Sequence, residues 1–222
     1  MTELLNDDII KQIREVFDDG LKNPVQVMFF GSKENCQYCD ETRQLAEEVT
    51  TISDLLSIEL YDIDADADLA EKYNVDKAPG LVIAAKEGDQ ITDFGVRLAG
   101  IPSGHEFTSL IQDIVLVSNR DSGLNPQTRE FLKTLDKPIT LQVFVTPTCP
   151  YCPQAVVLAH KMAMESPMIQ AEMVEATEFP ELANRHGVSG VPQTTINNGK
   201  AHVVGAVPES NMLAEIQRVL AG

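Results

Sequence analysis

The sequence contains no tryptophan, only four cysteines, and half as many basic as acidic side chains, 17 against 34. The resulting net charge of −17 repels phosphate backbones and anionic lipid headgroups, which argues against nucleic acid and membrane surfaces as partners. The chain also lacks an apolar run near the roughly 18 residues that a membrane span needs. Its first residues are acidic, whereas a signal peptide is basic and then apolar. We therefore expect a soluble, cytoplasmic protein.

The apolar content is nevertheless sufficient for a packed core. The chain has 222 residues, of which 43% are hydrophobic, and this excludes a disordered protein. At roughly 100 to 200 residues per domain, this length corresponds to one large or two small domains. Four cysteines in a reducing compartment are too few for a disulfide scaffold, so they indicate redox chemistry or metal binding.

The cysteines form two pairs with the same spacing. Cys36 and Cys39 enclose Gln-Tyr, and Cys149 and Cys152 enclose Pro-Tyr, so each pair is a CxxC motif with tyrosine before the second cysteine. The two motifs lie 113 residues apart. A repeated motif at a fixed offset prompts a search for other matches at the same offset.

Further matches at this offset show an internal duplication. Ala78-Pro79 corresponds to Val191-Pro192, and each proline lies 43 residues after the first cysteine of its pair. Asp62 corresponds in the same way to Glu175. The segment 118–126 between the copies is polar, rich in turn residues and without apolar periodicity, so we place the boundary there. The predicted domains are residues 1–119, with the CQYC motif, and residues 120–222, with the CPYC motif.

Hydrophobic periodicity predicts the same order of elements in both halves. Each half should contain a helix, a strand, a helix after the CxxC motif, a strand, a short helix, a proline loop, a hairpin and a final helix. Outside the helices that follow the motifs, the predicted ranges are 7–17, 25–30, 57–63, 67–73, 81–85, 91–98 and 103–117 in the first half, and 126–135, 139–145, 168–174, 180–186, 194–196, 202–204 and 209–220 in the second. Each CxxC motif therefore lies where a strand leads into a helix.

This arrangement resembles the thioredoxin and glutaredoxin fold, present twice. As a whole the chain resembles the tandem-thioredoxin, glutaredoxin-like protein disulfide oxidoreductases of archaea and bacteria, in which each domain carries its own CxxC. It implies an α/β fold of two tandem thioredoxin-like domains, each with a central mixed sheet flanked by helices and a CxxC at a helix N-terminus. The N-terminal part of alkyl hydroperoxide reductase flavoproteins is a second relative, but it has one working CxxC and here both are intact.

The position of each pair assigns roles to its sulfurs. A helix N-terminus favours negative charge, so it lowers the pKa of the first cysteine and populates the attacking thiolate. We expect Cys36 and Cys149 to be the nucleophiles. Cys39 and Cys152 would resolve the mixed disulfide, and the redox-active disulfides would be Cys36–Cys39 and Cys149–Cys152.

The duplicated neighbours of the pairs supply further candidates. By resemblance to the family's cis-prolines, the segments Ala78-Pro79 and Val191-Pro192 would bind an extended client segment beside the sulfurs. The two matched acids at strand ends, Asp62 and Glu175, are candidate proton acceptors for the resolving cysteines.

The nucleophilic cysteines of the two sites should differ in pKa. The chain up to Arg120 holds 24 acidic and 10 basic residues, and the remainder holds 10 and 7. Asp40 and Glu41 directly follow the first pair, whereas prolines surround Cys149. Because negative charge opposes a thiolate, we expect Cys149 to have the lower pKa of the two nucleophiles.

The leading hypothesis is an enzyme that reduces, forms or isomerises disulfides in client proteins. No bound cofactor is expected, since the cysteines are the redox centre, and by resemblance a thioredoxin reductase would donate the electrons. One alternative is an electron carrier for a dedicated partner such as a peroxidase. An alternative of another class is a client-binding chaperone or zinc-linked scaffold. Zinc is disfavoured because 109 residues separate Cys39 from Cys149, whereas zinc ribbons place the second pair about 15 to 20 residues on.

Overall fold

The two halves of the chain contain the same succession of elements, as the sequence predicts. The computed structural model describes residues 3–34 and 36–221. The first half comprises α1 (Asp7–Gly20), β1 (Val25–Gly31), α2 (Cys39–Thr50), β2 (Leu56–Asp62), α3 (Ala67–Lys72), β3 (Gly80–Glu87), β4 (Gln90–Ala99) and α4 (Glu106–Asn119). The second comprises α5 (Pro126–Lys133), β5 (Ile139–Val145), α6 (Cys152–Glu165), β6 (Ile169–Glu175), α7 (Pro180–Arg185), β7 (Gln193–Ile196), β8 (Ala201–Val204) and α8 (Glu209–Ala221).

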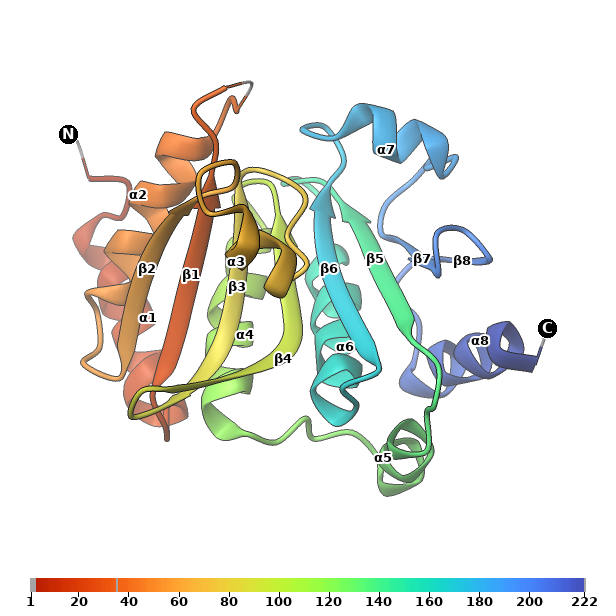
Figure 1. The fold of residues 1–222 in the computed structure, drawn as a ribbon. Coiled ribbons are helices and arrows are strands. Elements are labelled where there is room, and N and C mark those ends of the chain that lie inside the picture. Colours follow the sequence, from red (N-terminus) through yellow and green to blue (C-terminus); the bar gives the residue numbers. More distant parts are fainter. Residues whose placement is uncertain (1–2, 35, 222) are drawn as a thin grey trace.

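The strands of both halves form one continuous sheet (Figure 1). Its order, over the residues that the structure describes, is β2-β1-β3-β4-β6-β5-β7-β8. In each half a parallel pair, β1 with β2 or β5 with β6, adjoins an antiparallel hairpin, which gives a mixed thioredoxin-like sheet. The halves join where β4 pairs in parallel with β6, with Val96 opposite Ala171 and Ala99 opposite Val174. The sequence predicts these strands but not this join.

The two faces of the sheet are covered differently. One cluster of buried side chains extends from Phe17 on α1 through Ile114 on α4 to Ile216 on α8, so both halves share it. The opposite face carries the short helices α3 and α7 (Figure 1) over two smaller clusters, around Phe30 and around Phe144. The halves therefore pack on a common core, and their division at residues 119 and 120 stays a prediction.

One helix start differs from the sequence prediction. The final helix of the first half, α4, begins at Glu106 instead of residue 103. Gly104 just before it has a φ of +59°, and the N–H of His105 bonds the carbonyl of Pro147 at 2.9 Å instead of continuing a helix. The helices after the CxxC motifs, α2 and α6, begin at the second cysteine of each pair, so the first cysteine lies in the loop.

The helices are short. The three that reach 14 residues are α1, α4 and α6. Over residues 3–34 and 36–221, no helix combines the length and the apolar character needed to cross a bilayer.

Candidate functional site

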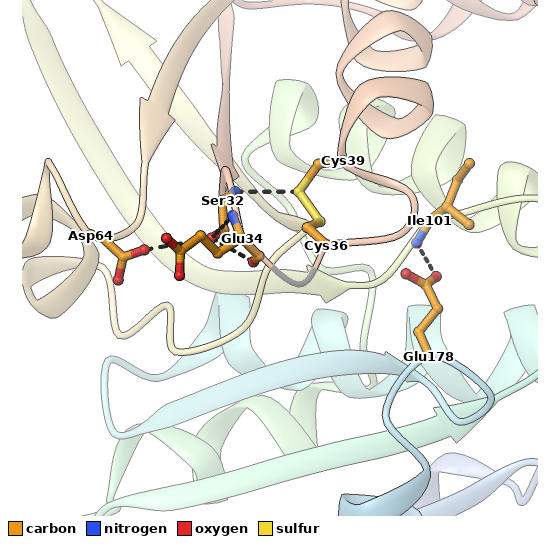
Figure 2. Close-up of a disulfide and its surroundings, with 7 residues drawn as sticks. All are labelled: Ser32, Glu34, Cys36, Cys39, Asp64, Ile101 and Glu178. Carbon is orange, nitrogen blue, oxygen red and sulfur yellow. Dashed lines mark hydrogen bonds between the residues drawn. A yellow bond between two sulfur atoms is a disulfide. The ribbon is translucent and has the colours of Figure 1, made fainter.

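The first cysteine pair lies where the loop after β1 leads into α2, with Cys36 in the loop and Cys39 at the start of the helix. Cys36 and Cys39 form a disulfide with their Cα atoms 5.5 Å apart. The backbone N–H of Ser32 donates a hydrogen bond to Cys39 Sγ at 3.3 Å (Figure 2). Cys39 is 9% exposed and belongs to the large core cluster, whereas Cys36 is partly buried at its margin. The predicted nucleophile is thus the more accessible residue of the pair.

The second pair has the same covalent geometry in a more enclosed setting. Cys149 and Cys152 form a disulfide with a Cα separation of 5.5 Å. Cys149 is 7% exposed and Cys152 is fully buried, so the first cysteine is again the more accessible. The N–H of Cys149 donates to the carbonyl of Thr146 at 3.1 Å, which fixes the loop ahead of α6. The second site exposes less of its first cysteine than the first site does.

The two helix starts present different charges to their sulfurs. The first turn of α2 carries Asp40 and Glu41, both exposed. The first turn of α6 carries Pro153 and no acid. Unpaired N–H groups at a helix start favour a thiolate in both sites, and the acids of α2 oppose this effect only in the first. This difference is the one that the sequence predicts.

The matched prolines follow cis peptide bonds, Ala78–Pro79 and Val191–Pro192. Ala78 and Val191 are partly buried against the same core cluster as the cysteines. Each proline carbonyl accepts a hydrogen bond at 2.8 Å from a glycine, Gly100 in the first half and Gly205 in the second. The same loop pairing is therefore built twice.

The matched acids have the same place in the sheet but different surroundings. Asp62 and Glu175 end β2 and β6. Asp62 accepts the N–H groups of Asp64 and Ala65, and these bonds, chiefly that from Ala65, lower the pKa of its carboxyl. Glu175 is 1% exposed and accepts the Thr177 hydroxyl at 2.6 Å and the Glu178 N–H at 2.7 Å. Each carboxylate thus binds the turn that follows its strand, and the role as proton acceptor stays a prediction.

A buried polar group between α4 and α6 is absent from the sequence-based candidates. Glu106 is 1% exposed, and Asp113 and His160 are fully buried. Asp113 Oδ2 lies 2.9 Å from His160 Nδ1, and Ser109 donates to Glu106 Oε2 at 2.6 Å. Burial raises the pKa of Glu106 to about 7; Asp113 raises it further, while Ser109 and His160 oppose the rise. Burial likewise raises the pKa of Asp113.

The two buried acids of this group could have been found from the sequence. Glu106 and Asp113 are seven residues apart, which places them on one face of a helix, and Leu110 and Ile114 share that face. Acids at core-facing positions of an amphipathic helix are rare unless they are paired. His160 gives no such signal, because its partner Asp113 lies 47 residues away and in the other half.

The connection from β4 to α4 touches both sites. Its first residue, Gly100, bonds Pro79 of the first site. Ile101 donates its N–H to Glu178 of the second half at 2.6 Å (Figure 2). Farther along, a Cβ at Gly104 would overlap the carbonyl oxygen of Pro147, two residues before Cys149. The segment 100–105 therefore links the proline loop of one site to the cysteine loop of the other.

Metal-ligating side chains do not gather elsewhere in the part of the chain that the structure describes. No group of three or more histidine, cysteine, aspartate or glutamate side chains there could hold an ion. The four sulfurs lie in two different halves, each bonded within its own pair.

Comparisons with known sequences extend the likeness beyond the motifs. A family model described as a thioredoxin domain matches residues 139–218, which include the second pair. The chain is 27% identical over 194 residues to an alkyl hydroperoxide reductase of Staphylococcus aureus, covering 87% of this chain and 34% of that protein. It is 24% identical over 182 residues to an NADH dehydrogenase of Ferdinandcohnia aciditolerans, covering 82% and 32%. The chain thus spans about a third of the length of these relatives.

Solved structures match both halves together. An N-terminal domain of alkyl hydroperoxide reductase AhpF from Enterococcus faecalis shares the fold, with a TM-score of 0.85 at 24% identity over 95% of this chain and 99% of that one. A protein disulfide oxidoreductase from Aeropyrum pernix K1 is 33% identical, with a TM-score of 0.87 over 96% of this chain and 92% of that chain. With two disulfide-bonded CxxC pairs on a duplicated thioredoxin fold and this match along nearly its whole length, the chain belongs to the tandem thioredoxin-fold family of protein disulfide oxidoreductases.

Proposed function

We propose that this chain catalyses thiol–disulfide exchange on client proteins at two sites, reducing, forming or isomerising their disulfides. One observation carries the proposal: each half holds two sulfurs at bonding distance beside a helix start, with the first cysteine the more accessible. A paired, accessible thiol at a helix N-terminus is suited to attack a disulfide and to be released by its neighbour.

Reduction of a client disulfide takes two successive exchange reactions. The thiolate of Cys36 or Cys149 attacks one sulfur of a client disulfide, forming a mixed disulfide and releasing the other client sulfur as a thiolate, which takes up a proton. Cys39 or Cys152 then loses its proton and attacks the enzyme sulfur of the mixed disulfide. This forms the CxxC disulfide and releases the second client thiol. The enzyme dithiol loses two electrons and two protons, and the client disulfide gains them; formation of a client disulfide is the reverse.

Client segments would lie along Ala78-Pro79 at one site and along Val191-Pro192 at the other. In this proposal Asp62 and Glu175 are candidate acceptors for the proton of the resolving cysteine. Glu106 is a third candidate, at the second site.

The parallel packing of α4 against α6 supports Glu106 as a candidate proton acceptor. Contacts near their starts, His105 with Pro147, and along their middles, Asp113 with His160, show that the two helices run in the same direction. Glu106 opens α4 and therefore lies level with the first turn of α6, where Cys152 is buried. A carboxyl with a pKa of about 7 can both take up and return a proton near neutral pH.

The decisive experiment compares the parent chain with the double variant Cys36→Ser/Cys149→Ser. Each would be assayed for reduction of insulin disulfides by dithiothreitol and for recovery of activity from a scrambled disulfide substrate. We expect the double variant to lose both activities. A double variant as active as the parent would overturn the enzyme and leave the client-binding chaperone or scaffold. Reduction without recovery would limit the chain to a reductase.

A second candidate is an electron carrier that delivers electrons from a thioredoxin reductase to a peroxidase. The likeness to the alkyl hydroperoxide reductase of Staphylococcus aureus over 87% of the chain favours it. The test mixes the chain with NADPH, a thioredoxin reductase and a thiol peroxidase, and follows NADPH loss on adding peroxide. A rate that depends on the chain only when the peroxidase is present would support this role.

A further inference from the structure

The second half contributes a carboxylate to the surroundings of the first site. Glu178 lies between β6 and α7, and its Oε1 accepts the N–H of Ile101 at 2.6 Å. A Cβ at Gly100 would lie 2.6 Å from Glu175 Cβ and 2.7 Å from Glu178 Oε1, so only glycine permits this approach. Figure 2 shows Glu178 and Ile101 beside the Cys36–Cys39 disulfide.

This contact lies at the edge where a client segment would bind. Gly100 is held to the carbonyl of Pro79 by a hydrogen bond of 2.8 Å, and Ile101 is the next residue. An extended segment that pairs with the backbone of Ala78 would therefore pass close to Ile101 and Glu178. The side chain that meets the client there comes from the opposite half of the chain.

The second site has the same loop without the carboxylate. Gly205 bonds Pro192 just as Gly100 bonds Pro79. The residue after Gly205 is Ala206, and its N–H forms no hydrogen bond within residues 3–34 and 36–221. The turn of Glu178 meets the first site because β6 pairs with β4, whereas β8 is an edge strand and the corresponding strand of the first half, β2, forms the opposite edge. A carboxylate on this loop is therefore found, among the described residues, at the first site and not at the second.

Glu178 has no positively charged partner. It forms no ion pair with any lysine, arginine or histidine among the described residues. Its side chain is half-buried and borders an open groove. Burial, and to a lesser extent Glu175, raises the pKa of Glu178 to about 7, although the Ile101 N–H opposes this rise. Above that pH Glu178 is a negative charge without an ion-pair partner, bonded to Ile101 next to the first site's proline loop. The groove that it borders is lined also by Lys77 and Arg185 and by none of the residues of that loop.

We propose that Glu178 is a specificity-determining residue of the Cys36–Cys39 site, which selects disulfides flanked by positively charged groups. The Cys149–Cys152 site lacks this selection, because β8 ends the sheet and, in the described part of the chain, no strand-end turn of the first half lies against the loop after it. The assignment rests on the proposed function, because it concerns which disulfides enter the same exchange at Cys36.

The test measures charge preference at one site at a time. Cys149→Ser/Cys152→Ser leaves only the first site, and Cys36→Ser/Cys39→Ser leaves only the second. Each reduced variant is mixed, above pH 7, with cystamine, which carries two ammonium groups, or with dithiodiacetate, which carries two carboxylates. The quantity compared is the ratio of the two rate constants, since intrinsic differences between the reagents cancel between sites.

We expect the cystamine preference to be greater at the first site, and Glu178→Gln to lower it by about fivefold, the effect of one nearby charge near a wet surface. The glutamine still offers an oxygen to Ile101, so the loop contact is kept. Glu181→Gln is the matched control: Glu181 borders the same groove, is exposed and does not bond this loop. It should leave the ratio unchanged, which separates the effect of Glu178 from that of removing any carboxylate at this groove. Added salt should weaken the preference of the parent.

Two results would overturn the assignment in different ways. If both sites react and Glu178→Gln has the same ratio as the parent, Glu178 does not select clients and the proposed function stands. If neither site reacts with either reagent, the exchange activity itself is absent, and the assignment falls with it.

Discussion

The two redox sites share a backbone plan and differ in what the opposite half adds to it. At the first site the second half supplies Glu178, bonded to Ile101. At the second site the first half supplies the Gly104–His105 turn against Pro147 and places Glu106 at the start of α4 beside α6. The duplication thus produced two copies of one loop framework, and the parallel join of β4 with β6 made their environments unequal.

Neither half contains the whole of its own site. Each CxxC pair, its proline and its helix start come from one half, whereas neighbouring charge and loop support come from the other. A change at the junction should therefore act on both sites, and a change within one loop should act on one.

The largest effect is expected at the junction. Gly104→Ala would bring a Cβ into overlap with the Pro147 carbonyl at a φ of +59°, so we expect the free energy of unfolding to fall by about 4 kcal/mol. Gly123→Ala is the matched control, because its φ is +62° and its Cβ would meet nothing within 4 Å. That variant should lose about 1 to 2 kcal/mol, the cost of the left-handed conformation alone. Equal losses in urea unfolding would show that the Pro147 contact is unimportant.

The buried carboxyl of Glu106 on α4 should make the free energy of unfolding depend on pH. Its folded pKa of about 7 exceeds the ordinary 4.5, so the unfolded chain loses this proton first as the pH rises. Stability should therefore decline between those values, by roughly 3 kcal/mol from this one group. Glu106→Gln should reduce the decline by this amount, measured by urea unfolding across the same pH range, while the share of the other raised carboxyl, Glu178, remains. The exposed Glu130→Gln is the control, and an unaltered pH profile in Glu106→Gln would contradict the assignment.

The two nucleophiles should titrate differently. With Asp40 and Glu41 in the first turn of α2 and no acid in that of α6, we expect the pKa of Cys149 to lie below that of Cys36. The expected difference is on the order of one unit, about 1.4 kcal/mol. Thiolate absorbance of each single-site variant in its reduced form would measure it. A lower pKa at Cys36 would reverse the predicted asymmetry of the two sites.

The smallest effect is expected at Asp62. Its carboxylate is bound to the N–H groups of its own turn, and its nearest cation is Lys33 at 3.9 Å, itself exposed. Asp62→Asn should change the exchange rate of the first site by less than about twofold, since exposed ion pairs contribute little. A tenfold loss, with unfolding unchanged, would instead establish Asp62 as a proton acceptor.

Most of the fold was predictable because its signals are local. The strands β1 and β5 end within one residue of the ends that their apolar runs predict. The hairpin of the first half is longer than that of the second, as the predicted strand ranges also have it. The start of α4 was not predictable from local pattern. Its first turn is displaced by the His105–Pro147 hydrogen bond, whose two partners are 42 residues apart in the sequence.

Some residues of the candidate site were likewise predictable from the sequence, and others were not. The four cysteines and two prolines were found because the duplication repeats them at one offset. Glu106, Glu178 and His160 were not found, because none has a counterpart of its own kind at that offset. Glu178 and His160 each contact a residue of the other half, and repeat matching compares only equivalent positions of the two halves.

The sequence by itself determined two thioredoxin-like units, each with a CxxC pair, a proline 43 residues on, and an unequal share of acidic side chains. Those properties follow from short-range periodicity and from charge, which do not depend on how the halves meet. Tertiary structure alone decided that the units share one sheet and one core. It also brings the acids Asp113 and Glu178 to their partners in the opposite half, because pairing of β4 with β6 joins residues that no local pattern connects.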